Sequence, residues 1–218
     1  MEPISLEKIA ERLGTVSPRS AEITEISTDT RALAPGCLFL ALCGKNFDGH
    51  AFVSNAIDGG AIAAVTNQQM AEHPCIVVSD TGQALLDIAS LYREQFDIPL
   101  IGITGSVGKT TTKELTACVL SQHFNTLKTE ANLNNEIGMP KTLFGLTKTH
   151  GAAVIEMGMN HFGEISRMSR SAKPTIAVIT NIGFSHVENL GSQEGILKAK
   201  LEMLEGMEDV SYTHQTLP

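Results

Sequence analysis

The sequence has no run of lysine and arginine residues, no long apolar stretch and no pair of closely spaced cysteines. Its formal net charge is −8 over 218 residues, and the lack of a basic patch argues against a nucleic-acid-binding protein. Because no stretch of about 18 apolar residues occurs, we expect no membrane span. The start, Met1-Glu2-Pro3, lacks the basic and apolar parts of a signal peptide, so we expect a cytoplasmic protein.

The four cysteines are isolated, at positions 37, 43, 75 and 118, and no CxxC pair occurs. Cys37 lies beside an apolar run and Cys118 follows a helical pattern. We interpret both as small buried apolar residues and not as metal ligands. Reduced, separate thiols are typical of a cytoplasmic protein.

The length of 218 residues is sufficient for one large domain or two small ones. Hydrophobic residues make up 42% of the chain and charged residues 18%, an ordinary globular composition. Over the first 80 residues the pattern predicts a small α/β unit. A helix is expected over 5–13, with Ser5 as its N-cap and Gly14 as its stop. A second helix is expected over 51–57, and strands over 37–42, 61–66 and 76–79.

Strands and helices alternate after residue 80, which predicts a parallel sheet covered on both faces. The expected strands are 100–104, 152–157 and 175–180; the expected helices are 82–96, one from Lys109, 137–144, 163–170 and one ending near Glu205. The predicted fold class is therefore α/β, with a small domain over 1–80 and a second, incomplete parallel-sheet domain over 81–209. We expect the ending, 210–218, to be foreign to the protein.

The strongest local motif is the glycine-rich segment Gly105-Ser106-Val107-Gly108-Lys109-Thr110-Thr111, which lies between a predicted buried strand and a predicted helix. Gly105 and Gly108 would let backbone amides approach an anion, Lys109 would reach phosphate oxygens, and the Thr110 hydroxyl would ligate Mg²⁺. The strict P-loop pattern has glycine where this chain has Ile103. The motif favours a nucleoside triphosphate over the alternative, a glycine-rich turn with an exposed lysine.

Four segments, in order, extend this motif: 104–114, 132–140 (Asn-Leu-Asn-Asn-Glu-Ile-Gly-Met-Pro), 156–165 (Glu-Met-Gly-Met-Asn-His-Phe-Gly-Glu-Ile) and 180–188 (Thr-Asn-Ile-Gly-Phe-Ser-His-Val-Glu). Together they resemble the Mur ligases, enzymes that attach amino acids to UDP-N-acetylmuramic acid. The last three are typical of the members that add D-alanyl-D-alanine. The resemblance covers nearly the whole chain up to about residue 209.

The front of the chain agrees, since 27–31, 35–39 and 47–52 resemble the UDP-binding domain of this family. The resemblance implies that the nucleotide-sugar substrate is bound by Ser27, Asp29, Thr30, Arg31, Asp48, Gly49 and His50. A forked guanidinium such as that of Arg31 suits phosphate. The alternative for this region is a turn rich in helix-capping residues.

The resemblance also implies a reaction. ATP phosphorylates the terminal carboxylate of UDP-N-acetylmuramoyl-tripeptide, and the amine of D-alanyl-D-alanine then attacks the acyl phosphate, releasing phosphate. The chemistry requires ATP and Mg²⁺, because two anions must be brought together. The loop residues, Asn135 and Asn181 are the implied nucleotide contacts, although Asn134 and Asn135 could equally cap the helix near Ile137.

Three further residues gain roles from the resemblance. Glu156, at the end of a predicted strand, would hold Mg²⁺ together with Thr110, and His186 would hold a second Mg²⁺. Lys200 matches a lysine that is carbamylated in several Mur ligases, and it would be catalytic with Lys109 and His186. Each has a plain alternative: a surface glutamate, a solvated histidine, and a helix-surface lysine beside Lys198.

Family members have a longer central domain and a third domain, so we expect this chain to bind its substrates weakly and not to complete catalysis. An incomplete sheet is expected to expose an edge and apolar surface; the full-length protein is expected to be a monomer. Rival interpretations are a member that adds lysine or diaminopimelate, a non-catalytic nucleotide-binding fragment, and a general P-loop ATPase. The last has no use for a UDP-sugar domain at its front.

Overall fold

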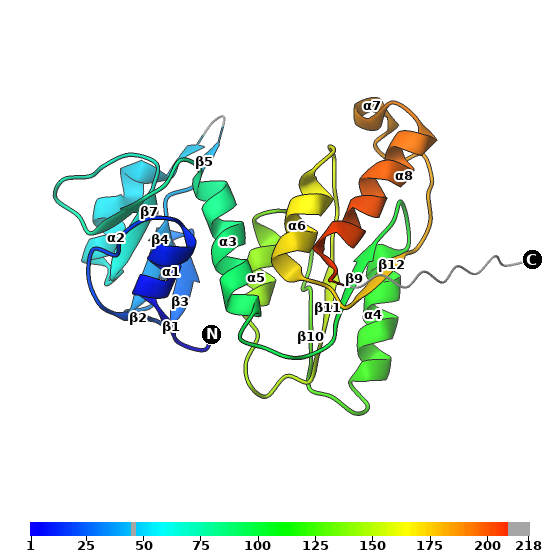
Figure 1. The fold of residues 1–218 in the computed structure, drawn as a ribbon, viewed down its shortest axis with the longest axis horizontal. Helices are drawn as coiled ribbons and strands as arrows, with labels where there is room; N and C mark the ends of the chain where they lie inside the picture. The colour runs from blue at the N-terminus through cyan, green and yellow to red at the C-terminus, as the bar shows by residue number, and fades with distance from the viewer. Residues whose placement is uncertain (45–46, 209–218) are drawn as a thin grey trace, which may run out of the picture.

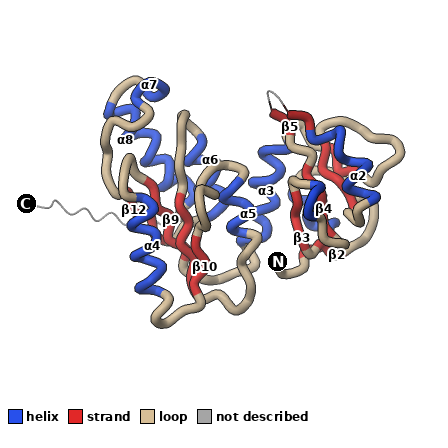
Figure 2. The backbone as a smooth tube through the Cα atoms, turned by 180° about the vertical axis from the view of Figure 1, so that it is seen from behind, coloured by secondary structure: helices blue, strands red, loops and turns tan. Residues whose placement is uncertain are grey.

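A computed structural model describes residues 1–44 and 47–208, so the predicted foreign ending, 210–218, lies outside the described residues. Two four-stranded parallel sheets lie on opposite sides of helix α3 (Thr81–Arg93) (Figures 1 and 2). The predicted α/β class with parallel sheets is confirmed.

The first sheet has the order β3-β4-β7-β8, with all neighbours parallel. Its strands are β3 (Glu25–Ser27), β4 (Cys37–Leu40), β7 (Ala63–Thr66) and β8 (Cys75–Val77). The predicted strands exist, but 37–42 and 61–66 are each two residues shorter, and 76–79 is observed one residue earlier at its start and two earlier at its end. Strand β3 was not predicted, because three residues carry too little pattern. Helix α1 (Leu6–Arg12) begins after Ser5, whose hydroxyl accepts from the Glu7 amide as an N-cap should.

Smaller elements complete this unit. The predicted helix 51–57 is the 3₁₀ helix η2 (Gly49–Phe52) followed by α2 (Val53–Asp58). A second 3₁₀ helix, η1 (Thr30–Ala32), follows β3. Two antiparallel pairs, β1 (Ile4–Ser5) with β2 (Glu22–Ile23) and β5 (Cys43–Gly44) with β6 (Phe47–Asp48), were not predicted.

The second sheet has the parallel order β10-β11-β9-β12. Its strands are β10 (Thr126–Lys128), β11 (Ala152–Glu156), β9 (Leu100–Thr104) and β12 (Ile176–Ile179). Helix α4 (Lys109–Leu120) packs on one face. The other face carries α5 (Gly138–Leu143), α6 (Glu164–Ala172) and η3 (Glu202–Gly206), which continues α8 (Gln193–Leu201). The short α7 (Val187–Leu190) precedes α8.

One hydrophobic cluster joins the two sheets through α3, and two smaller clusters lie beside it among the described residues. The joining cluster contains Leu38 of β4, Leu85 and Ile88 of α3, and Ile155 of β11. Tyr92 of α3 stacks edge-on against Phe144, with ring centroids 5.8 Å apart, and donates its hydroxyl to the Leu146 carbonyl over 2.5 Å. Because α3 contacts β7 of the first sheet and also helices α5 and α6 beside the second, the domain boundary near residue 80 stays a prediction.

One cysteine prediction is wrong. Cys37 is buried in β4, as expected, but Cys118 is exposed. Helix α4 buries Lys113 and Ala117, and Cys118, one position on, is rotated away from the sheet. The same outer face of α4 carries Leu115 and Val119, which are 64% and 69% exposed.

Among the described strands, β10 pairs with β11 alone and β12 with β9 alone, so both are edge strands of the second sheet. Ile176 of β12 is half exposed. That an edge is exposed because the sheet is incomplete stays a prediction.

Candidate active site

The glycine-rich loop begins where β9 ends, at the carboxyl edge of the second sheet, and leads directly into α4. Gly105 has φ +151°, and a Cβ there would lie 1.8 Å from Thr180 Oγ1, so only glycine fits. Gly108 has φ +81° and precedes the first residue of α4. The predicted strand–loop–helix arrangement is therefore present, and the free amides of the first turn of α4 point to the carboxyl edge.

Asn181 supports this loop from the neighbouring strand end. Its Oδ1 accepts from the Val107 amide over 3.0 Å, and its carbonyl accepts from the Ser106 amide over 3.1 Å. The Lys109 ammonium donates to the Gly105 carbonyl over 2.9 Å, folding back over the loop. The Asn181 side chain therefore contacts the loop itself. The amides of Lys109, Thr110 and Thr111 belong to the first turn of α4, where a helix has no acceptors of its own for its amides, so they are the donors that could bind an anion.

Glu156, the last residue of β11, is 2% exposed and lies against the start of α4. Its Oε2 accepts from the Thr110 hydroxyl over 3.0 Å, and its Oε1 accepts from the Asn134 amide over 2.9 Å. Cis ligands of an octahedral Mg²⁺ lie about 2.9 Å apart when the metal–oxygen distance is about 2.0–2.1 Å. The Thr110 and Glu156 oxygens have this spacing, so the residues present fit the metal that the motif implies.

A cleft of about 270 Å³ opens beside this pair. Lys109, His186 and Lys200, far apart in sequence, all line it, and so do Gly105, Asn134, Asn135, Gly158, Met159, Asn160 and Glu164. His186 has φ +63° and precedes α7, so its left-handed backbone turns the chain at the edge of the cleft. Lys200 is not on the helix surface: it is 2% exposed, and burial together with the nearby Lys109 cation lowers its pKa to about 8.

Asn134 and Asn135 differ in what they contact. The Asn135 Oδ1 accepts from the Ile137 and Gly138 amides over 3.2 and 2.8 Å, which is the capping geometry left open by the sequence. Asn134 instead donates to Glu156, and its carbonyl accepts from the Gly158 amide over 2.8 Å. Asn134 therefore orients the carboxylate, a contact that sequence reasoning did not assign to it.

A second pocket, of about 400 Å³, lies at the front unit and is lined by Thr28, Asp29, Thr30, Arg31, Phe39, Phe47 and Phe52. The rings of Phe47 and Phe52 stack with centroids 5.7 Å apart. The Arg31 guanidinium pairs with Asp29 over 2.6 Å and holds the pKa of that carboxyl well below its usual range. The aromatic residues were missed as site residues; their signal was two phenylalanines, 47 and 52, within a short polar segment.

The remaining predicted front residues have local structural contacts. The Ser27 hydroxyl, largely buried, donates to the Asp29 carbonyl over 3.0 Å. The His50 Nε2 accepts from the Asn67 amide over 3.2 Å, so the proton is on Nδ1, which donates to Asp48 Oδ1 over 2.6 Å. Gly49 packs directly on the backbone of Ala41.

Asp48 and His50 lie with Cys43 in a trio whose spacing could hold a metal ion. The protonated Nδ1 leaves that nitrogen no lone pair for a metal.

Comparison with known proteins decides the family. The profile of the Mur ligase middle domain matches residues 103–213, and that of the Mur ligase family catalytic domain matches residues 22–93. The chain belongs to the Mur ligase family.

Relatives of this Mur ligase chain share its sequence closely over part of their length. It is 52% identical to the UDP-N-acetylmuramoyl-tripeptide–D-alanyl-D-alanine ligase of Synechocystis sp., covering 84% of this chain and 41% of the relative. It is 42% identical to that of Bacillus subtilis, covering 94% and 47%. The chain thus spans less than half the length of these curated relatives.

Solved structures of Mur ligases are also similar to this chain. MurF from Acinetobacter baumannii matches with a TM-score of 0.88 and 38% identity, covering 95% of this chain and 47% of that one. MurF from Thermotoga maritima in complex with ADP matches with a TM-score of 0.79 and 30% identity, covering 84% and 43%. A diaminopimelate ligase is similar in fold alone, with a TM-score of 0.62 and 19% identity.

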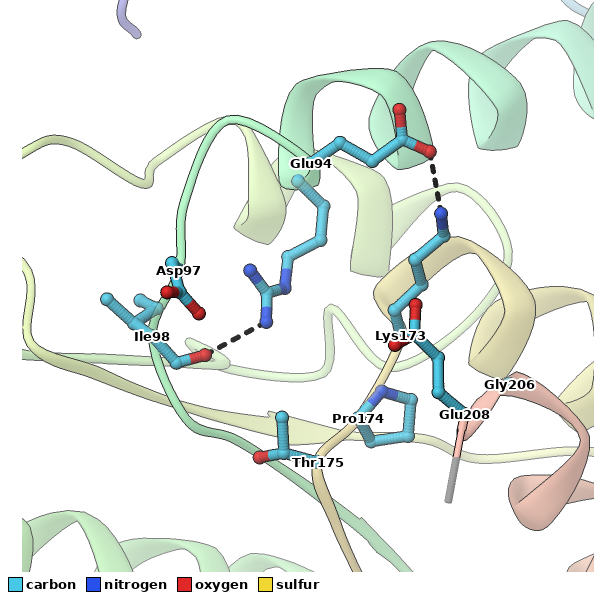
Figure 3. A pocket seen from close by; sticks show the side chains of 9 residues that line it. Glu94, Asp97, Ile98, Lys173, Pro174, Thr175, Gly206 and Glu208 are labelled. Atoms are coloured by element: carbon cyan, nitrogen blue, oxygen red, sulfur yellow. Dashed lines mark hydrogen bonds and ion pairs between the residues drawn. The ribbon is translucent and has the colours of Figure 1, made fainter.

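A third hollow, of about 430 Å³, lies at the other end of the strands in this Mur ligase fold, where β9 and β12 begin (Figure 3). Lys173 pairs with Glu94 over 2.6 Å, and Arg93 donates to the Ile98 carbonyl over 3.0 Å. Ligands of open α/β sheets bind at the carboxyl ends of strands. This hollow lies at the opposite end of the strands, so it is separate from the glycine-rich loop.

Among the described residues, no helix is both long and apolar enough to cross a membrane.

Proposed function

We propose that this protein is an ATP-dependent, ADP-forming ligase that adds D-alanyl-D-alanine to UDP-N-acetylmuramoyl-tripeptide in the synthesis of peptidoglycan precursors. The observation that carries the proposal is the pairing of Thr110 with the buried Glu156 beside Lys109, on a chain whose relatives carry this activity in their names. The identity of 38% to a MurF structure, against 19% to a diaminopimelate ligase, favours the dipeptide over a single amino acid.

The chain's own residues would bring two anions together. Lys109 and the amide dipoles at the start of α4 offset the charge of the triphosphate. Thr110 and Glu156 would hold Mg²⁺, which supplies further charge neutralisation on the phosphates. The γ-phosphoryl group passes to the tripeptide carboxylate, leaving ADP. The dipeptide amine then attacks the acyl carbon, the C–O bond to phosphate breaks, and a proton leaves the nitrogen.

His186 and Lys200 form the other part of the cleft lining and are proposed to act on the acceptor side. We propose that Lys200 is carbamylated: its pKa of about 8 leaves a fraction of neutral amine, which adds CO₂ and loses a proton. The product is an anion that would offer oxygen ligands beside His186. An unmodified Lys200 would instead act as a second cation near Lys109.

The front pocket is the proposed site of the UDP moiety. Its exposed Phe47 and Phe52 rings offer a flat apolar surface to a pyrimidine base. Arg31, which is largely exposed, has donors beyond those used by Asp29 and would bind the diphosphate. Asp29 and Thr30 would contact the ribose. We further propose that the full-length protein works as a monomer in the cytoplasm.

The test is phosphate release from ATP by this chain and by a form extended to the length of its relatives, with UDP-N-acetylmuramoyl-tripeptide and with or without D-alanyl-D-alanine. We expect dipeptide-dependent release by the long form and none by the 218-residue chain. Release that requires a single amino acid would move the protein to the lysine- or diaminopimelate-adding class. ADP binding without release by either form would leave a nucleotide-binding protein.

A further inference from the structure

Lys113 is a buried cation to which the proposed reaction gives no role. It lies in α4, three residues after Thr110, and is 2% exposed. Lysine is among the residues least often fully buried, because an ammonium loses hydration that the interior replaces only in part. A buried lysine beside a nucleotide loop therefore requires an explanation.

The ammonium contacts the residue that holds Glu156. Lys113 Nζ donates to the Thr129 carbonyl over 2.7 Å and lies 3.0 Å from Glu114 Oε1. Thr129, fully buried after β10, accepts from the Glu156 amide through its hydroxyl over 2.9 Å. The Thr129 amide donates to the Val154 carbonyl over 3.0 Å, which joins it to β11.

Residues three apart on a helix share one face, so Thr110 and Lys113 of α4 both lie on the side of the helix that faces Glu156. Thr110 contacts the carboxylate directly, and Lys113 fixes the residue that binds the Glu156 backbone amide. Removing Lys113 would leave the Thr129 carbonyl buried without this partner, so Thr129 would be held less firmly by its remaining bonds to Val154 and Glu156.

We propose that Lys113 is a positioning residue that sets the Glu156 carboxylate for a divalent cation through Thr129. The proposal rests on the proposed function in one respect, the role of Glu156 as a metal ligand. A cation ligand must be held within about 0.5 Å of its productive place, and a side chain at the end of a strand owes its position to its backbone.

The variants are Lys113→Met and Thr129→Val, with Thr129→Ser as the conservative change that keeps the hydroxyl. Lys128→Met is the matched control, because Lys128 pairs with the same Glu114 over 2.5 Å but from a more exposed position. The first readout is amide hydrogen exchange at Glu156. The reference amide is Met157, which donates to the Ile103 carbonyl and reports on the stability of the sheet.

In both Lys113→Met and Thr129→Val we expect exchange at Glu156 to be at least about fivefold faster relative to Met157, the effect of losing one hydrogen bond. Thr129→Ser and Lys128→Met should match the wild type. Equal acceleration at both amides would mean that Lys113 serves sheet stability alone, and would overturn the proposal. Unchanged exchange at Glu156 would overturn it as well.

The second readout is ADP affinity with and without Mg²⁺, measured by calorimetry. We expect the gain in affinity from Mg²⁺ to fall about tenfold in Lys113→Met and Thr129→Val, while Mg²⁺-free affinity stays constant. If the wild type itself gains nothing from Mg²⁺, the metal role of Glu156 fails, and this proposal fails with it. If the wild type gains affinity and both variants keep that gain, the positioning role alone is overturned.

Discussion

The Thr110 hydroxyl donates to Oε2 of Glu156 over 3.0 Å, although 46 positions separate the two residues in the chain. Thr110 is in the first turn of α4, and Glu156 is the last residue of β11. They meet because β11 lies beside β9, which leads into α4, and parallel strands end at the same edge. The proposed chemistry depends on this meeting.

Replacing Glu156 by glutamine tests the metal role directly. Glu156→Gln removes the charge and keeps the shape, so we expect the Mg²⁺-dependent gain in ADP affinity to fall by at least about tenfold. Calorimetric titrations with and without Mg²⁺ measure it. Glu11→Gln, an exposed carboxylate of α1, is the control. A full Mg²⁺ effect in Glu156→Gln would remove Glu156 from the proposed site.

Alanine at the two loop glycines should give unequal losses of stability. Gly108→Ala places a side chain at φ +81° with no atom within 4 Å, so we expect a loss of about 1–2 kcal/mol from backbone strain. Gly105→Ala must also displace Thr180, whose hydroxyl bonds to the Val107 carbonyl over 2.6 Å. We expect a further loss of about 1–3 kcal/mol from overpacking.

Urea denaturation measures both glycine variants. Gly14→Ala, at φ +68° and with no neighbouring atom within 4 Å, is the reference for strain alone. A Gly105→Ala protein as stable as Gly108→Ala would show that the Thr180 contact is not rigid.

Lys200 should make the unmodified protein more stable as the pH rises. Its pKa is about 8 in the folded chain, against an ordinary value of 10.5 for a solvated lysine. Between these two values the unfolded chain binds more protons, so unfolding becomes less favourable as the pH rises. Below pH 8 Lys200 is charged in both the folded and the unfolded chain, and folding carries the full free-energy cost of burying its ammonium. Lys200→Met, which removes it, should therefore stabilise the protein at neutral pH by about 1–3 kcal/mol.

The measurement is urea denaturation of the CO₂-free chain at several pH values from about 7 to about 10, a range that spans most of the interval between the folded and unfolded pKa values. The advantage of Lys200→Met over the wild type should shrink as the pH rises. Lys198→Met, two positions away and exposed, should follow the wild type at each pH. A constant difference between Lys200→Met and the wild type would contradict the lowered pKa.

Arg31 should contribute to binding of the UDP moiety. Arg31→Met removes the forked donor, and we expect UDP affinity to fall at least about tenfold, because hydrogen bonds between charged groups contribute about 1.5–3 kcal/mol. Titration calorimetry with UDP measures it, and Arg19→Met, another exposed arginine, is the control. Equal UDP affinity in both variants would place the diphosphate elsewhere.

Phe47 tests the base-binding surface of the front pocket. Phe47→Leu keeps apolar volume but removes the flat ring, and we expect uridine affinity to fall about fivefold or more, since base–aromatic stacking contributes about 1–3 kcal/mol. Phe124→Leu, a partly exposed phenylalanine after α4, is the matched control. Loss of binding by a similar factor in both would indicate general destabilisation.

The sequence by itself determined the elements and the nucleotide loop. Apolar alternation, caps and glycines are local, so β9 was predicted at its observed bounds and α1, α3 and α4 began at or next to their predicted first residues. The exposed Cys118 shows the limit of this reasoning, because a helical pattern does not say how far around the helix its neighbours extend.

Only the tertiary structure decided which residues meet. The order of the strands in the second sheet differs from their order in the chain, because β10 and β11 lie on one side of β9 and β12 lies on the other. That order brings Asn181 under the loop, Asn134 and Thr110 onto Glu156, and Lys113 onto Thr129. These contacts join residues from 16 to 74 positions apart. Long-range packing creates them, and local sequence patterns carry no information about that packing.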